Sequence, residues 1–128
     1  MSKKNTGANF EPIFWSIYEQ FQSFRSNPEK EGDDQELNLY VYEPDRYETE
    51  FTVTRKWSTY TSVTEVFAYK ENQNLLLIVK KNVSGTDGYK AEQKEYRLDL
   101  DLDFVHEVKF KRKFDGFKVQ INGVKFEV

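Results

Sequence analysis

The chain has 128 residues, of which 38% are hydrophobic, with no cysteine and a formal net charge of −3 at pH 7. This length suits one domain with a substantial core, and the lack of cysteine excludes disulfides, a thiol nucleophile and thiolate metal sites. The longest apolar run, residues 75–79, is too short to span a bilayer, and no apolar segment follows the N-terminal lysines. We therefore expect a soluble, cytoplasmic protein.

Residues 1–8 are expected to form a disordered tail, and residues 9–128 a single domain. The first element of that domain is an amphipathic helix, expected at about residues 12–25. Pro12 suits the first helical position because its missing N–H would have no partner there, and Asn27-Pro28 ends the helix. Apolar residues recur at spacings of three and four and form one stripe: Ile13, Phe14, Ile17, Tyr18, Phe21 and Phe24.

An acidic linker follows at residues 29–36, and strands are expected over about residues 37–128. The first strands are 37–43 and 47–57, separated by a turn at Pro44-Asp45, and then 63–70 and 75–83, separated by a turn at 71–74. Residues 75–83 carry apolar side chains on both faces, which is typical of a central strand that is covered on both sides.

From Tyr96 to Val128 the sequence alternates between apolar and polar residues, which indicates strands with one buried face. Asp115-Gly116 and Asn122-Gly123 are preferred centres of two-residue hairpins, because a type I′ turn needs positive φ at both central residues. The end of the chain is therefore predicted to be a β-meander. Residues 96–114 form either one strand that bends near Asp103 or two strands joined by a loop of odd length.

Together these elements predict an α+β fold, with the N-terminal helix packed on a mainly antiparallel sheet of about seven or eight strands. A helix of fourteen residues is about 21 Å long, which is enough to cover roughly four strands spaced about 4.8 Å apart. The sheet must therefore curl around the helix, fold into two layers, or bury its remainder in a dimer. We expect the curled sheet.

The sequence offers little catalytic equipment. His106 is the only histidine, and its neighbours in the alternation are Phe104 and Val108, which favours a structural role over a general base. The aspartates in residues 99–103 lack the glycine and glutamate of a calcium loop, and no phosphate loop, zinc spacing or serine elbow occurs. We expect no enzymatic activity, no cofactor and no metal.

Two charged stretches are candidate interaction surfaces. The predicted hairpins place Lys113 opposite Lys118, a repulsive pair, which fits either an anionic partner or a face protected against aggregation. This basic surface comprises Lys109, Lys111, Lys113, Lys118 and Lys125. The second stretch, residues 29–50, is acidic. It is either a plain acidic linker, which we favour, or a surface that imitates nucleic-acid phosphate or docks on a basic protein patch. Its candidate residues are Tyr40, Tyr42, Tyr47, Glu48 and Glu50.

Three polar residues fall on the apolar side of the alternation and form a candidate pocket: Arg112, His106 and Arg55. Each arginine either lays its stem on aromatic rings and reaches water or holds an anion inside the curled sheet.

These features predict a small, non-enzymatic, intracellular interaction module that binds or inhibits another macromolecule through surface complementarity. One alternative is a small-ligand carrier with an aromatic cavity inside the curled sheet. The other is nucleic-acid binding through the basic face of the meander. We expect a protein partner and no membrane association, and a homodimer is compatible with all three functions.

Overall fold

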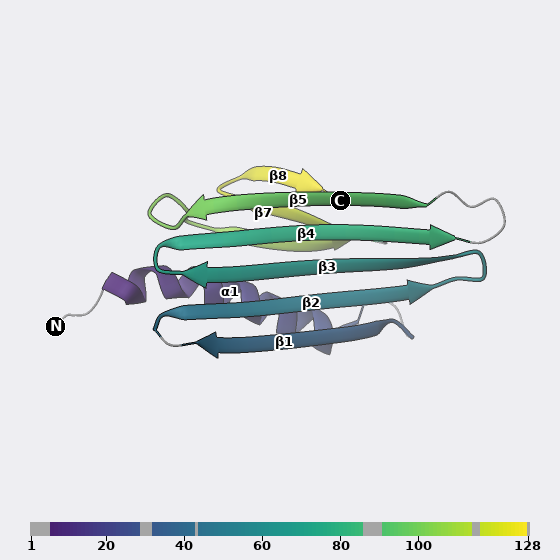
Figure 1. Cartoon of the computed structure of the whole chain (residues 1–128), viewed down its shortest axis with the longest axis horizontal. Helices are drawn as coiled ribbons and strands as arrows, with labels where there is room; N and C mark the ends of the chain where they lie inside the picture. The colour runs from purple at the N-terminus through teal and green to yellow at the C-terminus, as the bar shows by residue number, and fades with distance from the viewer. Residues whose placement is uncertain (1–5, 29–31, 43, 86–90, 114–115, 128) are drawn as a thin grey trace.

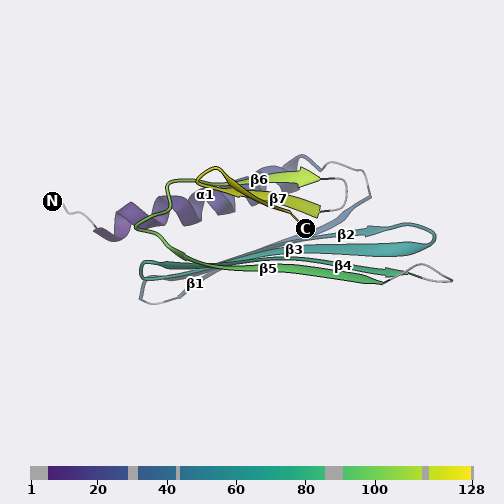
Figure 2. The same cartoon turned by 90° about the horizontal axis from the view of Figure 1, so that it is seen from above.

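The computed structural model has two layers (Figures 1 and 2), and it describes residues 6–28, 32–42, 44–85, 91–113 and 116–127. One layer is a five-stranded antiparallel sheet in the order β1-β2-β3-β4-β5. Its strands are β1 (Asp34–Tyr42), β2 (Arg46–Lys56), β3 (Tyr60–Glu71), β4 (Asn74–Gly85) and β5 (Glu92–Asp101). The other layer contains α1 (Thr6–Ser26) and a three-stranded antiparallel sheet of β6 (Val108–Lys113), β7 (Gly116–Ile121) and β8 (Val124–Glu127).

The α+β class and the antiparallel pairing are confirmed, and the described residues form eight strands. The curled sheet is wrong, because the strands form two separate, open sheets in two layers. Figure 1 shows that α1 lies behind β1–β3 and that the small sheet lies behind the remaining strands. Because the two together cover the five-stranded sheet, it does not need to curl around the helix. The described part of residues 96–114 forms two strands rather than one bent strand, but the connection between them, residues 102–107, is of even rather than odd length, and β5 and β6 belong to different sheets.

Asn122 holds the connection between the two layers, residues 102–107. Its side-chain Oδ1 accepts hydrogen bonds from the backbone N–H groups of His106 (2.8 Å) and Glu107 (3.2 Å). Its Nδ2 donates to the carbonyl of Phe104 (2.6 Å). These bonds satisfy backbone groups that have no strand neighbour in this segment. The connection therefore depends on a residue that lies in the β7–β8 turn.

α1 places the predicted apolar stripe in the core. Phe14, Ile17 and Phe21 are fully buried. The ring of Phe21 stacks on Phe51 of β2, with centroids 5.7 Å apart, and also contacts Phe110 of β6 at 5.3 Å. One side chain thus joins the helix to both sheets. The helix begins at Thr6, earlier than expected, so Pro12 lies inside it rather than at its first position.

The β7–β8 hairpin follows the prediction. Asn122 and Gly123 have φ values of 48° and 88°, and Ile121 pairs with Val124. The type I′ chemistry of Asn-Gly therefore determines this register.

The β6–β7 hairpin has a different register from the one expected. Lys113 pairs with Gly116, so Lys111 rather than Lys113 faces Lys118. A shift of two residues keeps every side chain on its predicted face. Gly116 belongs to β7 rather than to the expected Asp115-Gly116 turn, and residues 114 and 115 lie outside the described residues.

α1 completes the edge of the small sheet. The side-chain amide of Gln20 donates from Nε2 to the carbonyl of Val108 (2.8 Å), and its Oε1 accepts from the N–H of Phe110 (2.8 Å). Gln20 thus pairs with β6 much as a neighbouring strand would. Arg112 of β6 donates to the carbonyls of Phe24 (3.1 Å) and Asn27 (2.8 Å). It thereby satisfies acceptors at the helix C-terminus, where a positive charge also suits the helix dipole.

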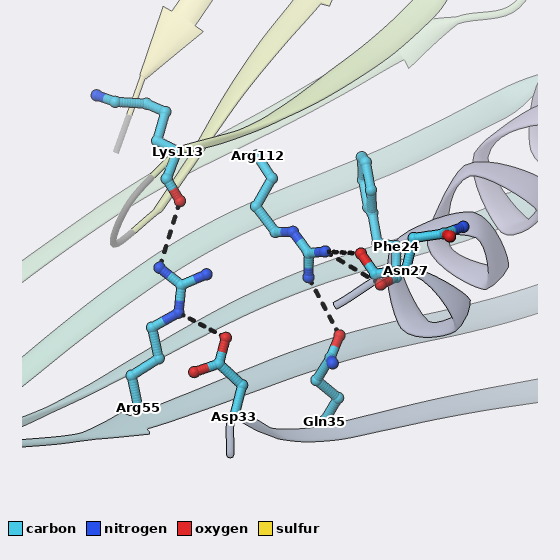
Figure 3. A network of polar contacts seen from close by, with 7 residues as sticks. All are labelled: Phe24, Asn27, Asp33, Gln35, Arg55, Arg112 and Lys113. Atoms are coloured by element: carbon cyan, nitrogen blue, oxygen red, sulfur yellow. Dashed lines mark hydrogen bonds and ion pairs between the residues drawn. The ribbon is translucent and has the colours of Figure 1, made fainter. Parts of the chain in front are cut away.

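A second arginine joins the two layers nearby (Figure 3). Arg55 of β2 is 5% exposed, and its Nε lies 3.0 Å from Oδ2 of Asp33, whose side chain is equally buried. Its guanidinium also donates to the carbonyl of Lys113 (3.5 Å), while Arg112 donates to Gln35 of β1 (3.1 Å). Both guanidinium groups therefore bond across the interface between the layers.

Gln20→Leu is expected to lower the free energy of unfolding by about 1–2 kcal/mol, because partly buried backbone groups of β6 lose their partner. Gln22→Leu is the matched control, since Gln22 is exposed on the same helix; it should change stability by less than about 0.5 kcal/mol. Urea unfolding followed by circular dichroism measures both. Equal effects would contradict a pairing role for Gln20.

Candidate protein-binding surface

The outer face of the five-stranded sheet is open to solvent. α1 and β6–β8 all lie on the opposite, inner side (Figure 2), and no described element packs on the outer side. Inner residues of the central strands, such as Val66 and Leu77, are fully buried, while the residues that alternate with them are partly exposed. We call this open side the outer face.

An apolar strip runs along the middle of the outer face, on β3 and β4. In the register of these strands Tyr69 pairs with Leu76, and Phe67 pairs with Ile78. All four side chains are partly exposed. Phe67 and Ile78 help to line a shallow hollow of about 280 Å³, whose other lining residues are Glu50, Thr52, Glu65, Val66 and Lys80.

Carboxylates surround this apolar strip. The strand register places nine acidic and four basic side chains of the described residues on the outer face. This excess of five acids is larger than the formal charge of −3 of the whole chain. The acids are Asp34, Glu36, Glu48, Glu50, Glu65, Glu71, Glu95, Asp99 and Asp101, and the bases are Arg46, Lys56, Lys80 and Arg97.

Glu50 lies where the acids are most crowded. It pairs across the strands with Phe67, at the border of the apolar strip. Burial raises the pKa of Glu50 above its ordinary value, and the nearby carboxylates of Glu48, Glu65 and Glu36 raise it further. Both causes disfavour the charged form. A lysine or arginine from a partner would offset this repulsion.

The structure brings together most of the candidate residues of the acidic stretch. Four of the five share the outer face: Tyr40, Tyr42, Glu48 and Glu50. Tyr47 lies on the inner side, with its ring centroid 5.4 Å from that of Phe14 and 5.3 Å from that of Trp15. Sequence reasoning missed the apolar strip as a site. The signal was present, because β4 is apolar on both faces, but it was interpreted as cover on both sides.

The five candidate lysines share the outward side of the small sheet, which we call the basic face: Lys109, Lys111, Lys113, Lys118 and Lys125. Lys111 directly faces Lys118, and Gln120 lies between Lys109 and Lys125. Because the residues that alternate with them, such as Phe117 and Val119, are buried against the other layer, the basic face points away from the outer face. The molecule therefore has oppositely charged sides.

The candidate pocket residues do not lie together. Arg55 and Arg112 border a common cavity, but its volume is only about 10 Å³, which is room for about one water molecule. His106 is exposed and lines a separate groove with Gln20 and Lys109. The expected alternation fails here because residues 102–107 are not a strand, so Val105 is buried and His106 faces solvent.

No protein family, curated protein or solved structure matches the chain. Within the described ranges, no three His, Asp or Glu side chains are grouped so that they could hold a metal ion. No helix in the same ranges is long and apolar enough to cross a membrane. The candidate surface is therefore defined by its own geometry and charge.

Glu50→Gln is expected to stabilise the protein at neutral pH. Because the pKa of Glu50 is raised in the folded state, the folded protein binds more protons than the unfolded chain, and stability falls as pH rises from 4.5 through the folded-state pKa. A neutral glutamine removes this loss. The stabilisation by glutamine should be complete at pH values above the folded-state pKa of Glu50 and absent below pH 4.5.

Thermal unfolding of the wild type and the variant between about pH 3.5 and pH 8 measures this dependence. Glu19→Gln, at an exposed position of α1, is the control and should show no comparable gain. A Glu50→Gln variant no more stable than the wild type at pH 7 would contradict the crowding of these carboxylates.

Proposed function

We propose that this chain is a small, non-enzymatic interaction module that binds another protein through the outer face of its five-stranded sheet. The observation that carries the proposal is the apolar strip, which is left open to solvent and is bordered by acids. An exposed apolar patch with a polar rim is typical of a protein-binding site. The excess of carboxylates favours a partner of opposite charge.

The partner is expected to present apolar side chains together with lysine or arginine. Its apolar side chains would bury Phe67 and Ile78 and fill the hollow between them and the neighbouring carboxylates. Its basic side chains would pair with Glu50 and Glu65. A purely basic partner would leave the strip exposed, and a purely apolar one would bury carboxylates without counter-charges, which is costly. A segment that carries both kinds of side chain fits best.

Phe67→Lys should weaken partner binding at least about tenfold, because it removes an apolar contact and repels the partner's bases. The new lysine would face Glu50 within the chain, so the fold should tolerate it. The experiment is capture of a partner from an extract of the source cells, followed by calorimetry with the purified partner and each variant.

Lys118→Glu is the matched control, since it changes charge on the opposite side of the molecule and should leave the affinity unchanged. Failure of the wild type to bind any protein stoichiometrically would argue against an interaction module. Equal losses for the two variants would exclude the outer face as the docking surface.

The basic face supports a second candidate function, which is nucleic-acid binding. Lys111 and Lys118 face each other across β6 and β7, and like charges in this position destabilise a strand pair. Glu127, which pairs with Lys118 across β7 and β8, offsets part of this repulsion. An anion that lies between the two ammonium groups would relieve the repulsion. Phosphates along a nucleic-acid backbone supply such anions without any need for base contacts.

Under this second function, a fluorescent single-stranded DNA should bind with an affinity that falls steeply between about 50 and 200 mM salt. Lys118→Glu should reduce binding at every salt concentration, whereas Phe67→Lys should not. Fluorescence anisotropy measures both effects. Absence of binding by the wild type even at the lowest salt concentration would exclude this function.

A further inference from the structure

The two edges of the five-stranded sheet differ in their protection. β5 carries six charged residues among its ten, and charged side chains on an edge strand discourage pairing with another chain. β1 has six consecutive uncharged residues, 37–42, with neither lysine nor proline among its nine residues. Within the described part of the sheet β1 pairs only with β2, so its free edge can accept a further strand.

The side chains at the end of β1 are unusually exposed for their chemistry. Tyr40, Val41 and Tyr42 are 42%, 60% and 38% exposed. Tyr40 and Tyr42 lie on the outer face and Val41 on the inner side, so a further strand at this edge would cover part of each side chain through cross-strand contacts.

We propose that β1 pairs in an antiparallel arrangement with β1 of a second copy of this chain, around a twofold axis at Asn38. Asn38 is the middle residue of the nine in β1, so this register pairs the whole strand with its copy. The two five-stranded sheets then become one continuous sheet of ten strands. This inference is independent of the identity of any other partner.

Complementary hydrogen-bonding groups within β1 select a second copy as the occupant. The acids Asp34 and Glu36 lie at one end of β1, and the tyrosines lie at the other. In the antiparallel register Glu36 faces Tyr40 of the second copy, and Asp34 faces Tyr42. Each carboxylate thus lies opposite a tyrosine hydroxyl that can donate to it. The hydroxyl of Tyr42 donates to Glu48 within one chain (3.5 Å), so Asp34 of the second copy would share or replace that acceptor. A parallel arrangement would instead place like charges side by side, which is destabilising.

The same register has a consequence for the inner side of the sheet. Leu37 would face Leu39 of the second copy, and both are already partly buried against α1 and the core. The apolar layer beneath β1 would therefore continue across the axis. Since such a twofold axis is perpendicular to the sheet, both outer faces would lie on one side of the dimer.

Two lysine variants test the register. Within one chain Asn38 faces Glu50 and Tyr40 faces Glu48, so both Asn38→Lys and Tyr40→Lys gain a carboxylate neighbour and should fold at least as stably as the wild type. In the dimer the new lysine of Asn38→Lys faces its own copy, whereas that of Tyr40→Lys faces Glu36. Asn38→Lys should weaken dimerisation at least about tenfold, and Tyr40→Lys should preserve it.

Sedimentation velocity over a wide concentration range measures dimerisation, and thermal unfolding verifies that each variant is folded. A concentration-dependent wild-type dimer that Asn38→Lys alone disrupts supports the proposal. A wild type that stays monomeric throughout overturns it. So does a dimer that both variants preserve or both disrupt, because the contact then lies elsewhere or has another register.

Single cysteines give an independent geometric test, since the natural chain has none. Paired residues in antiparallel strands have Cα atoms about 4.5–5.5 Å apart, within the range of about 4.4–6.8 Å that a disulfide needs. Asn38→Cys should therefore form a covalent dimer under mild oxidation. Glu36→Cys should not, because in this register it is four residues away from its own copy. Equal cross-linking of the two variants would overturn the axis at Asn38.

Discussion

The whole architecture depends on how little of a five-stranded sheet one helix can cover. A helix with its side chains is about 10 Å wide, whereas five strands spaced about 4.8 Å apart are about twice as wide. α1 runs roughly along the strands rather than across them (Figure 1), so its length does not increase the number of strands that it covers. The inner face needs a second cover, which β6–β8 supply. All described elements outside the five-stranded sheet therefore lie on its inner side, and the outer face stays open.

A layer built from a helix and a sheet creates a problem at their shared edge. β6 presents backbone donors and acceptors toward α1, and a helix has no free ladder of its own to offer. Gln20 solves this with a side-chain amide that contains one donor group and one acceptor, as a peptide does. Arg112 then satisfies carbonyls at the helix end. Polar contacts therefore orient the two halves of the layer, and the aromatic core below supplies the hydrophobic stabilisation.

Features that depend on neighbouring residues in the sequence were predicted correctly. The apolar stripe of α1 and the Asn122-Gly123 hairpin follow from periodicity and turn preference, and both lie where the sequence places them. The division into two sheets could not be predicted in this way, because alternation in residues 96–114 is the same whether consecutive strands share a sheet or not. The two sheets are separated by the connection at 102–107, which Asn122 holds through three hydrogen bonds. Such bonds do not produce a periodic pattern in the sequence.

The apolar strip of the candidate surface was missed by sequence reasoning for a related reason, although four of the acidic-stretch residues were predicted. Apolar residues on both faces of β4 indicate that burial of both faces would be favourable. They do not indicate whether other parts of the same chain bury them. Here the inner residues are covered by α1 and the small sheet, while Phe67 and Ile78 are not. The observation that this face is left open therefore requires the topology as well as the pattern.

Two places on the surface work against the stability of the isolated chain. Glu50 is crowded by carboxylates on one side of the molecule, and Lys111 faces Lys118 on the other. Both lie on exposed sheet faces, where a substitution of charge would not disturb the core. A partner of opposite charge at either place would relieve this repulsion on binding. If two copies join along β1, the acidic faces lie on one side, and a partner with two basic segments would gain affinity from engaging both at once.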